Sequence, residues 1–206
     1  MCKVNNSWRP LTTSEICNHQ RAYELLGNDL MKIFAFVEPS KGNKNCYGHE
    51  IYQLLLRVCT EFESVCKLAK IRLEHEGNPD KWNITSYSEL NDCKIGLGVL
   101  SKYKFEFVEY PDIGFIQPLQ SFSNNEKKKP EFYAAYTEVK HDRNNKFSEA
   151  NLWSLLNSYA GLTAVMFWQG IDTNISGWLG LGGYINTKFG RFECPVESGE
   201  PIYGCF

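Results

Sequence analysis

Residues 130–169 read PEFYAAYTEVKHDRNNKFSEANLWSLLNSYAGLTAVMFWQ, and this stretch decides the fold. It predicts two helices joined by a polar elbow at residues 141–146. Pro130 suits the first position of the first helix, where a missing N–H leaves no hydrogen bond unmade. Ser148 has the character of an N-cap for the second helix. Apolar residues follow it at three- and four-residue steps, which predicts one buried helix face.

Two longer helices and a short one are predicted upstream of this stretch. Residues 13–36 carry an imperfect apolar stripe. Residues 48–76 keep the helical period throughout their apolar positions, which makes this the strongest helix signal in the chain. Ser86 and Glu89 have the spacing of a capping box, so a short helix is expected near residues 87–94.

Residues 102–122 predict a small β-hairpin insertion. Tyr103, Phe105 and Phe107 alternate with charged residues, a period typical of a half-buried strand. A turn rich in proline and glycine follows, and the next segment can return as a partner strand. Pro118 would restrict that returning strand to an edge, because proline cannot donate a ladder hydrogen bond.

The whole chain, residues 1–206, is predicted to form a single, mainly α domain. Its helical bundle core covers about residues 13–169 and carries the hairpin insertion. Residues 170–206 are rich in glycine and aromatic residues, which predicts an irregular tail or short strands packed on the bundle. A composition of 43% hydrophobic and 22% charged residues is typical of a globular protein. The net charge of −2 disfavours a broad basic surface for nucleic acid but permits a local basic patch.

The cysteines and the apolar runs indicate a protein of the reducing cytoplasm. The eight cysteines include no C-x-x-C pair, and Cys59 and Cys66 fall on one face of a predicted helix as small hydrophobic residues. No apolar run is long enough for a membrane span, and the first residues lack the apolar core of a signal peptide. A cytoplasmic location with no membrane partner is therefore expected.

The elbow carries the candidate site residues Lys140, His141, Arg143 and Lys146. Histidine titrates near neutral pH and can act as a general acid or base, so His141 and Arg143 are the candidate catalytic residues. Lys140 and Lys146 are the candidate phosphate-binding residues, beside a helix N-terminus that would favour an anion. In an alternative interpretation, His141 and Arg143 only close the first helix and pair with acidic residues of the helix before it.

Glu61 and Glu63 are those acidic residues, at opposite edges of the apolar stripe of the strongest helix. They are expected to support the elbow by orienting one of its cations. A metal site that adds His49 and Glu50 is disfavoured, because His49 and Glu61 lie about three helical turns apart. No cofactor and no metal are predicted. His75 is interpreted as part of a solvated helix end.

A family resemblance rests on the same stretch. Residues 130–143, PEFYAAYTEVKHDR, resemble the P-E-W-W-x-x-Y-N-x-V-K-H-D-R stretch of uncharacterised bacterial and phage proteins. The residues after the elbow resemble the F-x-x-A-N-L helix start of those proteins, through Phe147, Ala150, Asn151 and Leu152. Residues 51–63 resemble their L-L-L-x-x-x-x-E-x-E helix, and residues 116–119 their I-x-P-F segment. Such proteins are similar to the HEPN-like helical bundles.

The resemblance implies a HEPN-like bundle of a prokaryote or phage with RNA or a nucleotide as its partner. Many members of that superfamily are ribonucleases of toxin–antitoxin and phage-defence systems, often dimers, and others are nucleotide- or protein-binding modules. An enzyme of this kind would be a metal-independent endoribonuclease, with a homodimer partner or a cognate antitoxin. Catalytic members carry an arginine shortly before the histidine, whereas here Arg143 follows His141.

Two functions stay open on the sequence, and with them whether the protein is an enzyme at all. The first is RNA or nucleotide binding, with or without cleavage, at the elbow. The second is a non-enzymatic helical interaction module. Its binding residues would be aromatic side chains of the tail, among them Trp178, Tyr184, Phe189 and Phe192.

Overall fold

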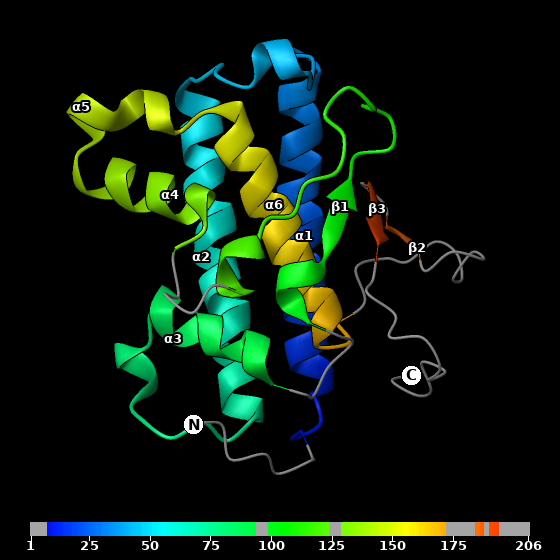
Figure 1. Cartoon of the computed structure of the whole chain (residues 1–206), viewed down its shortest axis with the longest axis vertical. Helices are drawn as coiled ribbons and strands as arrows, with labels where there is room; N and C mark the ends of the chain where they lie inside the picture. The colour runs from blue at the N-terminus through cyan, green and yellow to red at the C-terminus, as the bar shows by residue number, and fades with distance from the viewer. Residues whose placement is uncertain (1–7, 94–98, 124–128, 172–183, 188–189, 194–206) are drawn as a thin grey trace.

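The computed structural model describes residues 8–93, 99–123, 129–171, 184–187 and 190–193. Within these ranges the chain is mainly helical, as predicted. Three long helices pack together, and α2 (His49–Arg72) contacts both α1 (Thr13–Phe34) and α6 (Leu152–Trp168) (Figure 1). The elbow helices α4 (Glu131–His141) and α5 (Arg143–Lys146) lie beside one end of these long helices, and α3 (Ile84–Ser88) lies near the other end. None of the helices in the described ranges has both the length and the apolar character needed to cross a membrane.

Helices α1 (Thr13–Phe34) and α2 (His49–Arg72) confirm the two long helices predicted upstream. Helix α1 begins with a complete capping box, in which Thr12 and Glu15 satisfy each other's backbone N–H groups. The apolar stripe of α2 is buried along its length, including Cys59 and Cys66. Burial raises the pKa of both thiols, which agrees with their interpretation as small hydrophobic residues.

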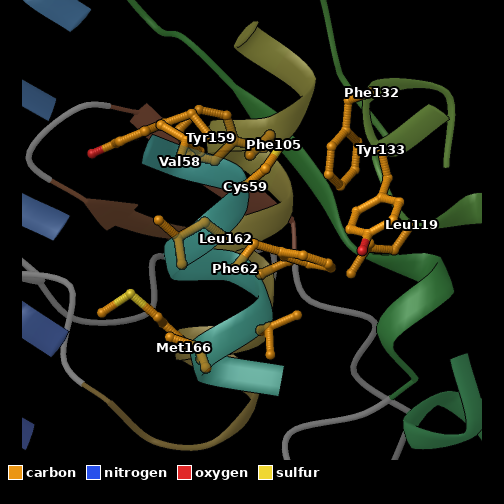
Figure 2. Packing of buried hydrophobic residues seen from close by; sticks show 14 of the residues in the cluster. Val58, Cys59, Phe62, Phe105, Leu119, Phe132, Tyr133, Tyr159, Leu162 and Met166 are labelled. Carbon is orange, nitrogen blue, oxygen red and sulfur yellow. The ribbon is translucent and has the colours of Figure 1, made fainter. Parts of the chain in front are cut away.

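Helix α6 (Leu152–Trp168) is the centre of the core. The sequence predicts one buried face, but the structure buries α6 on all sides, with only Trp153 and Asn157 partly exposed. The reason is that α2 and α4 pack against it from two directions and residues near β1 cover it further. Figure 2 shows part of this core, in which α2 and α6 side chains interleave.

Gly161 on α6 permits a close approach of α4. A Cβ atom at this position would lie 3.1 Å from the ring of Phe132 and 3.7 Å from Pro118. That spacing is tighter than ordinary contact, so a larger side chain would push the two helices apart. Phe132 in turn packs edge-on against Phe62 of α2, with ring centroids 5.4 Å apart.

The N-terminus of α6 differs from the prediction. Its N-cap is Asn151, whose side chain accepts a hydrogen bond from the N–H of Ser154, and Ser148 caps nothing. Asn151 is extended because it forms a β-bridge with Tyr47, and this bridge prevents the helix from starting earlier. The elbow itself folds into α5 (Arg143–Lys146) and the 3-10 turn η6 (Phe147–Glu149).

Helix α4 (Glu131–His141) confirms the first helix of the central pair, but Pro130 is its N-cap residue and Glu131 its first residue. Helix α3 (Ile84–Ser88) continues into η3 (Glu89–Asp92) and starts three residues earlier than predicted. Its cap is Asn83, because the Asn83 side chain accepts from the first free N–H groups. The remaining 3-10 turns are η1 (Lys41–Asn43), η2 (Pro79–Lys81), η4 (Leu100–Lys102) and η5 (Gln120–Ser123).

The predicted β-hairpin does not form. Strand β1 (Lys104–Glu106) meets the expected return segment in a single bridge, Phe105 with Ile116. Pro118 cannot extend that pairing, and the chain turns into η5. Instead β1 pairs antiparallel with β3 (Gly190–Glu193), which pairs antiparallel with β2 (Tyr184–Thr187). The tail therefore supplies two short strands, which was one of the two alternatives predicted for it. Its residues 172–183, 188–189 and 194–206, among them Trp178 and Phe189, lie outside the described ranges.

Candidate functional site

The elbow folds against the N-terminal end of α2. Arg143 donates a hydrogen bond from Nη2 to Nδ1 of His49, at 3.0 Å. Arginine has no acceptor, so Nδ1 of His49 accepts and the ring proton lies on Nε2. The guanidinium carbon lies 5.0 Å from the ring centre of Tyr52 and 5.5 Å from that of Phe147. Both distances are in the range of cation–π contact.

Phe147 is the hub of the aromatic side chains at this end. Its ring centre lies 5.7 Å from Tyr47, 5.0 Å from His49 and 5.8 Å from Tyr52. Tyr47 is 56% exposed, so this cluster reaches the surface. We call the cluster of Tyr47, His49, Tyr52, Arg143 and Phe147 the elbow surface.

A second cation–aromatic pair lies next to the elbow surface in the chain. Lys44 places Nζ 3.7 Å from the ring centre of Trp153, in the first turn of α6. The same loop binds the backbone of α6, since the N–H of Trp153 donates to the carbonyl of Lys44. One further step along the loop, Tyr47 bridges to Asn151. The segment before α2 thus brings the Lys44–Trp153 pair close to the cation–aromatic contacts of Arg143 in the elbow surface.

The prediction of an anion site at the N-terminus of α6 is wrong. The N–H of Leu152 donates to the carbonyl of Cys46 at 2.8 Å, and that of Trp153 to Lys44 at 3.0 Å. The N–H of Ser154 donates to the Asn151 side chain at 2.9 Å. The first amides of the helix are therefore already bonded, so an anion at the elbow has to be bound by side chains.

Lys140 belongs to a different set of contacts from Arg143. It donates from Nζ to the hydroxyl of Tyr136 at 3.0 Å, and this bond raises the pKa of Lys140. Tyr136 packs edge-on against Tyr133, with ring centres 5.3 Å apart. Tyr133 donates its hydroxyl hydrogen to Glu63. Burial and this hydrogen bond raise the pKa of Tyr133.

Glu63 therefore accepts a hydrogen bond from Tyr133. Its effect on an elbow cation is electrostatic, because its charge helps to raise the pKa of Lys140. Glu61 lies 2.5 Å from Nδ1 of His19 on α1, so it joins two long helices. His49 and Glu63 are fourteen residues apart on α2, a rise of about 21 Å. The predicted supporting carboxylates thus lie away from Arg143. The described residues contain no cluster of histidine, cysteine and acidic side chains arranged to hold a metal ion.

The other two predicted elbow residues differ in their surroundings. Lys146 pairs with Glu138 of α4, with 3.4 Å between Nζ and Oε2. His141, at the end of α4, is exposed, and among the described residues its side chain has no hydrogen-bond or ion-pair partner. The imidazole of His141 is therefore accessible to a ligand from solvent.

A groove of about 540 Å³ adjoins the elbow surface, between the C-terminal end of α1 and the N-terminal end of α2. Tyr47 and His49 line it and belong to both features. Its cations are already paired, because Asp29 binds both Lys32 at 2.7 Å and Arg57 at 2.6 Å. The rest of the wall is largely apolar, formed by Ile33, Phe36, Val37, Ile51 and Leu54.

The sequence located Arg143 but missed the aromatic residues that surround it. Tyr47, Tyr52 and Phe147 lie outside the apolar stripes that predict the core. Two of them flank the start of α2, and that position is the signal that could have indicated a surface role. Their meeting with Arg143 follows from the fold, since Arg143 and His49 are 94 residues apart in sequence.

Comparisons with known proteins add no relative to this geometry. The chain matches none of the family models, none of the curated proteins and none of the solved structures with which it was compared.

Proposed function

We propose that the elbow surface binds single-stranded RNA. The observation that carries this proposal is the guanidinium of Arg143, which lies over Tyr52 and Phe147 beside the exposed ring of Tyr47. Proteins bind single strands by stacking bases on aromatic rings and holding phosphates with cations. An arginine beside aromatic rings supplies both kinds of contact in one place.

Arg143 is the first phosphate-binding residue in this proposal. A guanidinium has five N–H donors in a planar fork, and among the described residues the side-chain hydrogen bond of Arg143 is the one to His49. The other donors can bind phosphate oxygens in the bidentate manner typical of arginine. Lys140 and Lys146 contribute less, because each already binds a side chain of α4.

The proposal extends to RNA cleavage by a HEPN-like protein of a prokaryotic or phage defence or toxin–antitoxin system. It is supported by the resemblance of residues 130–143 and by the exposed imidazole of His141. His141 would take the proton from a 2′-hydroxyl or deliver one to the leaving oxygen. Arg143 would stabilise the charge that develops on the phosphorus centre. No metal takes part in this chemistry.

Binding is tested with a fluorescently labelled 12-nucleotide single strand, measured by anisotropy. We expect Arg143→Gln to weaken binding about tenfold, because it removes the phosphate fork and the cation over the rings. Lys67→Gln is the matched control, since it removes the same charge far along α2, where Lys67 pairs with Asp80. Equal affinity of the parent and the Arg143 variant would overturn the proposal.

Cleavage is tested separately with the same strand in the presence of a metal chelator. Loss of cleavage in His141→Gln, with binding retained, assigns the acid–base role to His141. Cleavage that persists in this variant shows that His141 does not act in that role. Binding without cleavage in the parent limits the function to RNA binding.

A protein-interaction module is the second candidate function, favoured by the groove beside the elbow surface. Phe36 lines this groove and is 90% exposed, an unusual position for so large an apolar side chain. If the groove joins two copies of the chain, Phe36→Ser abolishes self-association in sedimentation experiments. Arg143→Gln leaves that association unchanged, which distinguishes the two functions.

A further inference from the structure

Beyond the C-terminal end of α2, a cysteine, a histidine and a carboxylate lie in a row. The thiol of Cys93 donates to the backbone carbonyl of Glu89 at 3.6 Å, and its sulfur is also 3.9 Å from Nε2 of His75, within reach of a sulfur hydrogen bond. On the other side of the ring, Nδ1 of His75 is 3.9 Å from Oε2 of Glu89. Glu89 also binds the buried ammonium group of Lys70 at 3.0 Å. These four residues are brought together from α2, the turn after it, and η3.

The interpretation of His75 as a solvated helix end is wrong. Its side chain is 10% exposed, because the backbone turns back at this point. Glu74 adopts the left-handed conformation, with φ of 51°, and the N–H of His75 donates to the carbonyl of Lys70. This turn directs the imidazole toward η3 and away from solvent.

The environment keeps His75 neutral and so able to accept a proton. Burial and the nearby charge of Lys70 lower the pKa of His75, and the carboxylate of Glu89 opposes them. At neutral pH the ring is therefore uncharged, and one of its nitrogens carries a lone pair that can accept a proton. With Nδ1 toward Glu89, the nitrogen that faces the Cys93 sulfur is the acceptor.

We propose that Cys93 is a reactive thiol whose proton is accepted by His75, and that it is a covalent modification site for small uncharged electrophiles. In this step the thiol proton moves to Nε2 of His75 and the sulfur lone pair attacks the electrophilic carbon. A sulfur–carbon bond forms, and the leaving group departs with its bonding pair. Glu89 is a positioning residue, since it faces the other ring nitrogen.

The other described cysteines supply internal controls. Cys59 and Cys66 are fully buried with no histidine contact among the described residues, and burial raises the pKa of both thiols. They are expected to be inert. Cys17 is exposed and has no imidazole beside it among the described residues, so it represents an ordinary surface thiol. Cys93 is itself largely buried, at 6% exposed against 0% for Cys59 and Cys66, and it differs from these three cysteines in having an imidazole nitrogen within reach.

The test is alkylation of the intact, folded protein by iodoacetamide, an uncharged reagent that releases iodide. The rate at each cysteine is measured from pH 6 to pH 9 by mass spectrometry of peptides. Below its pKa an ordinary thiol loses reactivity about tenfold per pH unit. The rate at Cys93 should change little between pH 9 and pH 7, because His75 accepts the thiol proton. A tenfold slope at Cys93 would overturn the proposal, whatever its absolute rate.

His75→Gln tests the proton acceptor directly. At pH 7 we expect this variant to alkylate Cys93 about tenfold more slowly, with Cys17 unchanged in the same sample. An unchanged Cys93 rate in a folded variant would overturn the role of His75. Thermal unfolding establishes whether the variant is folded. If it is not, the pH slope of the parent protein decides the question alone.

Discussion

Two arginines at opposite ends of α2 show how differently one residue type can be used. Arg72, in the last turn of α2, is 6% exposed and lies over the ring of Trp8 at 4.2 Å. Arg143, which folds against the first turn of α2, is exposed and lies over two rings. Both are arginines beside aromatic rings, so that pairing alone does not identify a binding site. The burial and the hydrogen bonds of each guanidinium separate the two roles.

The bonds of Arg72 tie together three parts of the fold. Its Nε donates to the carbonyl of Arg9 and its Nη1 to the carbonyl of Gln169, each at 3.0 Å. The N–H of Arg9 donates in return to the carbonyl of Arg72, and the Gln169 side chain donates to the carbonyl of Val65. The segment before α1, the end of α2 and the end of α6 are therefore joined at one buried cation.

The largest effect is expected from Arg72→Met. Methionine keeps much of the volume but removes the donors, so the carbonyls of Arg9 and Gln169 lose charged hydrogen bonds. We expect the free energy of unfolding to fall by about 3 kcal/mol, measured by urea titration. A loss below about 1 kcal/mol would show that Arg72 is not the structural arginine of the pair.

A smaller loss of folding stability is expected from Glu15→Gln. Glu15 pairs with Arg9 at 2.6 Å, and the carbonyl of Arg9 is bonded to Arg72 at the C-terminal end of α2. Glu15 also closes the capping box of α1. These bonds, with that to Arg9 the largest, lower the pKa of Glu15 to about 2. Because the pair is partly exposed, we expect a loss of only about 1 kcal/mol at pH 7.

The pH dependence of Glu15 has a definite sign. A carboxylate with a lowered pKa in the folded state stabilises the protein above its unfolded pKa, near 4.5. That stability is lost as the pH falls from about 4.5 toward 2. Urea titrations across this window should show a shallower decline in Glu15→Gln than in the parent. Parallel declines in the two proteins would show that Glu15 is not a source of this pH dependence.

Helices were predictable because their signal is local. The apolar stripe of α2 repeats within the segment itself, and its burial confirms that pattern. Strand pairing is not local, since Phe105 of β1 pairs with Phe192 of β3, far along the chain. The prediction of a return strand was wrong for the same reason, because β1 pairs mainly with β3 of the tail. The all-round burial of α6 likewise depends on neighbours that the segment does not encode.

The candidate site was predictable in part for a related reason. The elbow cations form a short run in the sequence, so Arg143 and His141 could be selected from it. The partners of Arg143 could not, because His49 and Tyr52 come from the start of another helix. The bonded amides of α6 depend on the loop at Lys44, which the sequence does not connect with the elbow.

The smallest stability change is expected from Arg143→Gln, and it sharpens the comparison most. Arg143 is exposed, and its hydrogen bond to His49 is open to water. Water can replace the lost donor there, so the free energy of unfolding should change by no more than about 0.5 kcal/mol. Urea titration of this variant beside Arg72→Met measures the contrast directly. A loss of about 3 kcal/mol in both would make Arg143 a structural residue, and any weaker RNA binding would then follow from a damaged fold. A stable variant that binds RNA more weakly would leave the elbow surface as the site of contact.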